Sequence, residues 1–222
     1  MSYIGSKRSS SLVSFDEGTI GSGVVFPAGM VIGSAITFFN QITSYTMQAG
    51  AAEGDYGLNT GIDIDDLTVT YTPLSTSNKL FVSGVMNFGV TGDTTGKAYC
   101  GVRVKRQVNG GGYSMLTAAM NTDTAAMPGT SSRIGIAGYS NRYAASNSTQ
   151  YGHTSFNLHF GFTDSSHVST VGHTVNYKIN HVLKSNDSGV KTLYLNRNGY
   201  NTNDYGSHTM VSYIRIEEIS NG

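Results

Sequence analysis

The sequence predicts an all-β protein: an antiparallel β-sandwich of the jelly-roll type, preceded by an extended N-terminal arm. Glycine makes up 28 of the 222 residues and only 13% of residues are charged, a composition poor for helices and favourable for strands and turns. Apolar and polar side chains alternate with a period of two along most of the chain. Turn signals rich in Gly, Asn and Ser separate these stretches, and no repeat of fixed period occurs, which favours a jelly roll.

Residues 1–29 are predicted to form the arm, and residues 30–222 the sandwich domain. The arm is rich in Ser and Gly, has no clear period and ends at a Phe-Pro-Ala-Gly sequence. It is nevertheless more apolar than a solvated tail needs to be, so we expect it to become ordered against a partner protein. The residues expected to anchor it are Tyr3, Ile4, Leu12, Val13, Phe15 and Ile20.

The predicted strands are read from the alternation of side chains. Leu67, Val69 and Tyr71, for example, point to one side of a strand while the three intervening or following threonines point to the other. A strand with one buried and one wetted face requires this pattern. Strands are expected near residues 30–43, 67–72, 79–90, 97–108, 113–118, 153–163, 173–184, 190–196 and 209–219.

Residues 119–150 contain few large apolar side chains and are predicted to form a long surface excursion, a kind of segment that often carries function. Tyrosines in or near loops rich in Gly and Asn could bind an external partner by stacking and hydrogen bonding. These candidate binding residues are Tyr139, Tyr143, Tyr151, Tyr200 and Tyr205.

The histidines are weighed as metal ligands. His153 and His159 share the wetted face of one predicted strand and lie six residues apart, roughly 20 Å, too far for one ion to bridge. A site assembled in space or around a symmetry axis stays open, although a wetted-sheet role is favoured. His181 shares its parity with Tyr177 and Ile179, which predicts a buried, hydrogen-bonded histidine.

Two further motifs fail the test of spacing. Residues 92–97, Gly-Asp-Thr-Thr-Gly-Lys, lack the first glycine and the Ser or Thr of a phosphate-binding loop, and a strand follows instead of a helix, so a hairpin turn is predicted. Asp63, Asp65 and Asp66 lack the glycine and glutamate of an EF-hand loop. A peripheral calcium site stays open there, but acidic residues at a strand edge are commonly a protection against aggregation.

No motif indicates an enzyme. The nucleophile-elbow pattern Gly-x-Ser-x-Gly is absent, and the single Cys100 excludes an intrachain disulfide and a cysteine-based zinc site. The net charge of zero disfavours nucleic acid as a partner, and no apolar run reaches the roughly 20 residues of a membrane helix. No secretory signal is recognised, so synthesis in a cytoplasm is expected. We expect no catalytic residue, cofactor or metal.

Several segments resemble the β-rich structural proteins of tailed bacteriophages, especially fibre-type proteins of marine and cyanobacterial phages. They are Met1–Gly5, Leu67–Val82, Val175–Ile179, Thr192–Arg197 and Ser212–Ile219. The resemblance implies a jelly-roll domain, often trimeric, that is assembled in the host cytoplasm and displayed on the virion surface. The family supplies no catalytic motif, and this chain has no coiled-coil or collagen-like shaft.

The predicted function is therefore that of a non-enzymatic phage structural protein. The first hypothesis is a trimeric tail fibre or tail-tip protein, docked through its arm to another virion protein and presenting loops to the host, where a surface glycan is a further candidate partner. A capsid decoration protein of the same fold and a free lectin-like carbohydrate-binding module are the alternatives. A jelly-roll hydrolase or cupin-type metal enzyme, using His153, His159 or His173, ranks last.

Overall fold

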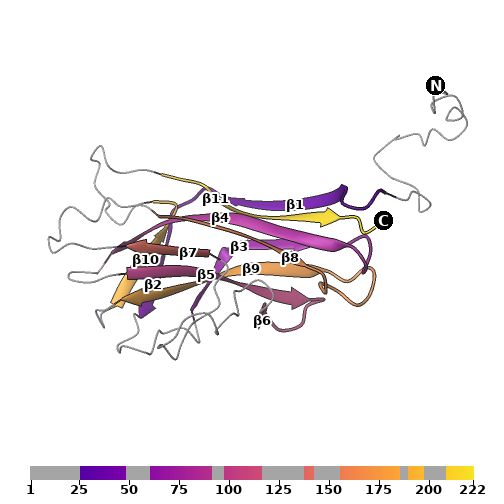
Figure 1. Ribbon diagram of the computed structural model, residues 1–222. Coiled ribbons are helices and arrows are strands. Elements are labelled where there is room, and N and C mark those ends of the chain that lie inside the picture. The colour runs from indigo at the N-terminus through magenta and orange to yellow at the C-terminus, as the bar shows by residue number, and fades with distance from the viewer. Residues whose placement is uncertain are drawn as a thin grey trace, which may run out of the picture.

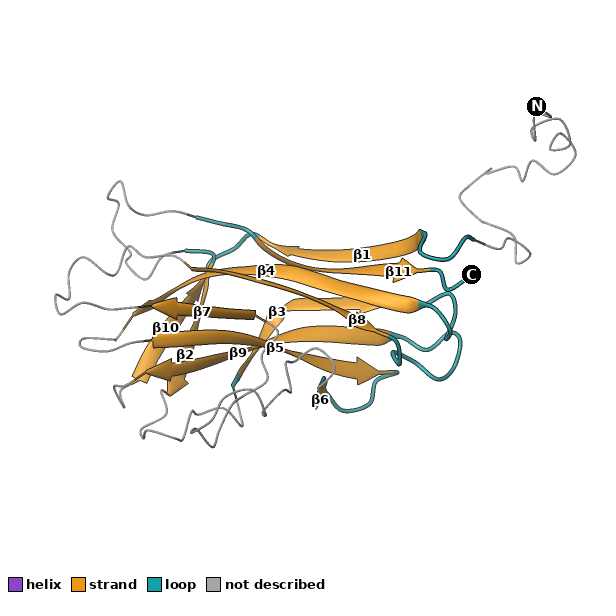
Figure 2. Cartoon of the chain, viewed as in Figure 1, coloured by secondary structure: helices purple, strands orange, loops and turns teal. Residues whose placement is uncertain are grey.

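The computed structural model consists of two antiparallel β-sheets that face each other, joined by turns and loops (Figures 1 and 2). The part of the chain that the structure describes contains no helix, and so none that could cross a membrane. This architecture confirms the predicted all-β sandwich. The described residues are 26–48, 61–91, 98–116, 138–142, 156–185, 190–197 and 209–222.

The strands are named here in chain order and labelled in Figure 1. They are β1 (Val31–Phe39), β2 (Thr43–Gln48), β3 (Ile62–Tyr71), β4 (Lys79–Thr91), β5 (Ala98–Val108), β6 (Ser114–Met115), β7 (Gly138–Arg142), β8 (Phe156–Asp164), β9 (Val175–Ser185), β10 (Val190–Leu195) and β11 (Ser212–Ile219).

The order of the strands is that of a jelly roll. Strands β10 and β11 pair with consecutive stretches of β4, and β2 and β1 pair with β10 and β11 in turn, so each couple is one long strand with an interruption. Strands β6 and β7 likewise both pair with β5. If β1 with β2, β6 with β7, and β10 with β11 are each counted as one long strand, the chain has eight long strands. In chain order, they lie first–eighth–third–sixth across one sheet and second–seventh–fourth–fifth across the other. The first and last long strands are neighbours, and all connections but one cross between the sheets.

One buried residue, Asn196, fixes both interruptions of the six-stranded sheet. It ends β10 with a left-handed backbone, φ 62°. Its side-chain amide donates to the backbone carbonyls of Phe39 (2.6 Å) and Gln41 (2.9 Å), where β1 gives way to β2. Its side-chain oxygen accepts a 2.6 Å hydrogen bond from the hydroxyl of Ser212, the first residue of β11. Asparagine suits this place because it tolerates the left-handed region and carries both a donor and an acceptor.

Replacing Asn196 by alanine is expected to lower the free energy of unfolding by about 2–3 kcal/mol, since three side-chain hydrogen bonds are lost and alanine tolerates the left-handed backbone less well than asparagine. Glycine at the same position loses the same bonds without the backbone strain. The Gly variant should therefore be more stable than the Ala variant by about 1 kcal/mol in urea denaturation. Equal losses would show that the backbone conformation of residue 196 costs nothing.

The core lies between the sheets and consists of the inward-facing residue of each alternating pair. Val82 and Phe88 of β4 and Tyr177 and Ile179 of β9 are all fully buried. Phe88 also stacks on Phe156 of β8, with 5.3 Å between ring centroids. Burying one such side chain stabilises a fold by about 1.5–3 kcal/mol. The outward-facing residues form two broad sheet faces.

The structure differs from the predicted strand bounds in a few places. The strand expected at 30–43 ends at Phe39, and β2, at Thr43–Gln48, was not predicted; the strand expected at 113–118 is reduced to the two residues of β6. Strand β3 begins at Ile62, five residues before the predicted start. Its register against β9 shifts between Ile64 and Thr68, and this irregularity interrupts the alternation from which the strand was predicted. Strand β7 lies within the span 119–150 that was predicted as a surface excursion.

Candidate interaction surface

Titratable residues gather at the end of the sandwich where β11 finishes, and Glu218 is one of those that are fully buried. Its carboxylate is fully buried and accepts hydrogen bonds from the Tyr71 hydroxyl (2.7 Å) and the Asn78 side-chain amide (2.6 Å). The backbone N–H groups of Leu74 and Ser75 also donate to it, at 2.9–3.2 Å. The last strand thereby holds the turn between β3 and β4. Every partner of Glu218 among the described residues is a neutral donor from that turn or the end of β3.

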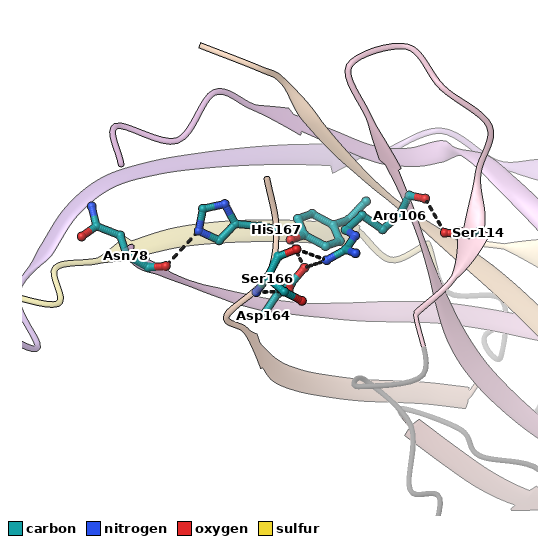
Figure 3. Close-up of polar contacts among 7 residues, drawn as sticks. Asn78, Arg106, Ser114, Asp164, Ser166 and His167 are labelled. Atoms are coloured by element: carbon teal, nitrogen blue, oxygen red, sulfur yellow. Dashed lines mark hydrogen bonds and ion pairs between the residues drawn. The ribbon is translucent and has the colours of Figure 1, made fainter. Parts of the chain in front are cut away.

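Asp164, at the end of β8, forms a second buried contact (Figure 3). It accepts hydrogen bonds from Arg106 Nη1 (2.7 Å), from the Tyr177 hydroxyl (2.6 Å) and from the backbone N–H of Ser166 (3.0 Å). Burial alone would raise the pKa of Asp164, but the hydrogen bonds from Tyr177 and Arg106 outweigh it and hold the pKa below its ordinary value. The ion pair joins β8 of one sheet to β5 of the other.

His167 completes this end of the molecule. Its ring Nε2 lies 2.8 Å from the backbone carbonyl oxygen of Asn78, as Figure 3 shows, and the ring is fully buried. Asp164 and Tyr177 are 1% and 0% exposed, so a substrate would have no access to these groups. Their partners are other residues of the same chain. The arrangement therefore stabilises the end of the sandwich, with Asp164, Tyr177 and His167 shielded from solvent.

The outer face of the smaller sheet, formed by β3, β9 and β5, is polar. Asp63 forms a 2.6 Å ion pair with Lys105, and Asp65 forms one of the same length with Lys178. Burial opposes ionisation of Asp63, but hydrogen bonds from Lys105 and Asn180 lower its pKa. Two of the three carboxylates considered for a calcium site are thus held by cations of the same chain.

The third carboxylate of that cluster, Asp66, accepts a 2.8 Å hydrogen bond from the Tyr45 hydroxyl. Within the described residues, no group of three His, Cys, Asp or Glu side chains is placed to hold a metal ion. The acidic cluster therefore ties strands together through Lys105, Lys178 and Tyr45.

The outer face of the larger sheet, over β1, β11, β4 and β8, is different in character. Register places Phe38, Tyr213, Val85 and His159 in one row across these four strands. Phe38 is 64% exposed, and its ring lies 6.0 Å from that of Tyr213. This row thus exposes aromatic and aliphatic surface to solvent.

The neighbouring rows of this face add further apolar surface and one internal ion pair. Ile36 is 45% exposed and lies opposite Arg215, whose guanidinium bonds Glu217 at 2.5 Å. The ring of Phe81 lies against Gly161, where an added β-carbon would come within 3.2 Å of it. Glycine there leaves room for the aromatic ring. We refer below to the outward residues of β1, β11, β4 and β8 as the apolar face.

The structure places the histidines that were considered as site residues in different surroundings. His159 is exposed on the apolar face, as its parity predicted. His181 is fully buried, also as predicted, but neither ring nitrogen has a hydrogen-bond partner among the described residues, so the predicted hydrogen bonding is wrong. His153 lies outside the described residues, and His173 precedes β9.

The tyrosines and arm residues named as candidate sites are largely untested by the structure. Tyr139 belongs to β7, where its backbone pairs with Gly101 of β5. The residues that lie outside the described part of the chain are Tyr143, Tyr151, Tyr200, Tyr205, Tyr3, Ile4, Leu12, Val13, Phe15 and Ile20.

Sequence reasoning missed Ile36 and Phe38 as surface residues. The signal is the nine-residue strand Val31–Phe39, which carries no charge and has apolar side chains at both parities. A strand of this kind predicts burial on both faces, yet here one face is open.

Comparisons with known proteins identify no family for this chain, and the solved structures that match are only distantly similar. No family model matches the sequence, and no curated protein does. Among solved structures, "Structure of infectious bursal disease virus Gx strain" matches with a TM-score of 0.35 and 12% identity over 92% of this chain. "Crystal structure of infectious bursal disease virus VP2 subviral particle" matches with a TM-score of 0.33 and 11% identity over 86% of this chain. This chain spans 42% and 39% of the lengths of those two chains, and TM-scores of this size are too low to indicate a shared function.

Proposed function

We propose that this chain is a non-enzymatic structural protein of a virion, a tail fibre or tail-tip protein that self-associates, most simply as a trimer. Residues 1–29 dock it to another virion protein, and its loops face the host surface. The observation that carries this proposal is the apolar face. A passive building block needs a surface for assembly, and the larger sheet offers one that the described residues leave uncovered.

The buried polar groups support a structural role over a catalytic one. Glu218, Asp164 and His167 are the titratable residues that a search for chemistry would select, and all three are almost completely shielded from solvent. Catalytic groups must reach a bound substrate. These side chains instead bind backbone and side-chain groups at one end of the sandwich, where they link the two sheets.

The two ends of the sandwich have different attachments. Ser220 exchanges backbone hydrogen bonds of 2.8 Å with Gly29 and Met30, and its hydroxyl donates to the carbonyl of Phe26 at 3.1 Å. Residues 26–29, the last part of the predicted arm, are therefore fastened beside the end of β11, near the C label in Figure 1. A tether preceding Phe26 leaves from this end, and β2, β4 and β9 finish at the other end.

Deleting residues 2–25 is expected to leave a folded protein that no longer enters virus particles, because the proposed anchor is lost and the hydrogen bonds of residues 26–29 to Ser220 are kept. Circular dichroism and thermal unfolding should match those of the full chain. Incorporation is measured by mass spectrometry of purified particles, with the full chain as control. Undiminished incorporation of the truncated chain would refute the anchoring role.

Immunogold labelling of particles distinguishes the positions that this fold can occupy. Label at the tail supports the fibre or tail-tip proposal. Label spread over the head lattice would replace it with a capsid decoration protein. Absence from particles, together with saturable binding of the purified chain to a glycan array, would replace it with a free lectin-like module.

A further inference from the structure

We infer that the apolar face is the surface through which copies of this chain bind one another, with the row of Phe38, Tyr213, Val85 and His159 as its anchor. The inference rests on the proposed function in that it names the surface behind the self-association proposed there. It commits to one occupant, a second copy of the same chain. Four properties of the described residues carry it.

The first property is the contrast between the two outer sheet faces. The face of β3, β9 and β5 is covered by ion pairs such as Asp63–Lys105 and Asp65–Lys178, as expected of a surface that stays in water. The face of β1, β11, β4 and β8 exposes Phe38 and Ile36 instead, at 64% and 45%. Among the described strands, exposed large apolar side chains therefore occur on the face that includes β1, which also carries the Arg215–Glu217 ion pair.

The second property is the edge strand. Strand β1 pairs with β11 on one side and with no described strand on its other side. Its sequence, Val-Ile-Gly-Ser-Ala-Ile-Thr-Phe-Phe, contains neither a charge nor a proline. Proteins usually protect an edge of this length with charged residues, prolines, β-bulges or a covering segment, and β1 has only a register shift at its start, between Val31 and Gly33. A long uncharged edge beside an exposed aromatic row is consistent with a strand that is covered in the assembly.

The third property is the charge on the face, which favours a copy of the chain over a charged partner. Arg215 and Glu217 form an ion pair with each other within the face, so their charges are already compensated without a partner protein. Two such faces can therefore meet without like-charge repulsion, and the chain as a whole carries no net charge. A strongly acidic or basic partner would find no complementary field here.

The fourth property is the size of the face. Eight residues of β11 at about 3.3 Å each, and four strands about 4.8 Å apart, outline roughly 500 Å². The outline is a lower bound on accessible area because side chains project from the sheet. A typical stable interface buries about 800 Å² per partner. The flat outline alone is below that value, so projecting side chains and residues at the rim must supply the remaining area; the aromatic residues of the face are of the kind found at interface centres.

The test is sedimentation velocity of the full chain and of two variants of the face. The unmodified chain is expected to sediment as an oligomer. Phe38→Lys places a charge at the most exposed aromatic position and should weaken association at least tenfold. Thr163→Arg places a long charged side chain on β8, opposite Phe81, and removes no large apolar side chain; it should also shift the protein toward monomer. If Phe38→Lys fails to fold by circular dichroism, Thr163→Arg decides the matter.

The matched control is Val171→Lys. Val171 is 65% exposed, nearly the same as Phe38 at 64%. It lies in the turn between β8 and β9, however, and so off the apolar face. This variant should sediment like the unmodified chain. A monomeric unmodified chain, two face variants that remain fully oligomeric, or dissociation by Val171→Lys as strongly as by Phe38→Lys would each overturn the inference.

Failure of the proposed function is read separately, from particles. If the unmodified chain is missing from virions but Phe38→Lys still dissociates it in solution, the apolar face stands as a self-association surface and the virion role falls. If the chain is present in virions but both face variants sediment as the same oligomer as the unmodified chain, the virion role stands and this surface is not the one that joins the copies.

Discussion

Replacing Glu218 by alanine is expected to destabilise the fold by about 3–5 kcal/mol, the largest loss we expect from any single side chain described above. The carboxylate itself is fully buried and accepts hydrogen bonds from Tyr71, Asn78 and the backbone of Leu74 and Ser75, at the junction of β3, β4 and β11. Removing it leaves four donors without an acceptor, and each buried donor left unpaired costs about 1–3 kcal/mol. Urea denaturation at a fixed protein concentration measures the loss.

The adjacent glutamate offers a control. Glu217 points to the other side of β11, where it bonds only the half-exposed Arg215 among the described residues. An ion pair of this kind contributes about 1 kcal/mol or less, so Glu217→Ala should change stability little. Glu218→Gln keeps the shape but turns an amide group toward donors, and should fall between the two. Equal losses from Glu217→Ala and Glu218→Ala would contradict the role assigned to the buried carboxylate.

Acid is expected to destabilise the protein through His181 by about 3–5 kcal/mol between pH 6.5 and pH 3. Burial lowers the pKa of His181 from 6.5 to about 3 in the folded protein. The unfolded chain takes up a proton near pH 6.5, whereas the folded chain stays neutral to about pH 3, so the stability present above pH 6.5 is lost as the pH falls. The slope is about 1.4 kcal/mol per pH unit for one proton.

His181→Leu isolates this effect. Asp63 and Asp164 have lowered pKa values and also lose stability in acid, but they do so equally in both proteins. The difference in unfolding free energy between variant and unmodified chain should therefore be flat above pH 6.5 and grow in favour of leucine below it. At pH 7.5 the leucine should be neutral or slightly stabilising, because the imidazole nitrogens have no partner among the described residues. Parallel curves from pH 7.5 to pH 4 would refute the account.

Strand parity made the fold predictable. The alternation of Leu80, Val82, Met86 and Phe88 on β4 identified the core-facing side, and these residues are fully buried. The same rule placed His159 outside and His181 inside. Parity is a local property of an extended backbone, so one sequence suffices to read it.

The partners of buried polar groups could not be read in this way. Parity turns Glu218 inward with Ile214 and Ile216, but its acceptor role depends on Tyr71, 147 positions earlier in the chain. Arg106 likewise points inward and meets Asp164, 58 positions away. Such pairings follow from which strands become neighbours, and spacing along the chain carries no information about that. The apolar face was missed for the same reason: four strands distant in sequence supply one row.

Because the backbone of Ser220 is bonded to Gly29 and Met30, the two ends of the described chain leave the sandwich at one pole. A fluorophore fused after Gly222 would therefore report on the surroundings of the tether. One inserted between Ser185 and Val190, the flanks of the β9–β10 connection, would report on the distal pole instead. Probes at these two positions mark opposite ends of the sandwich, so together they would give the orientation of the protein on a particle.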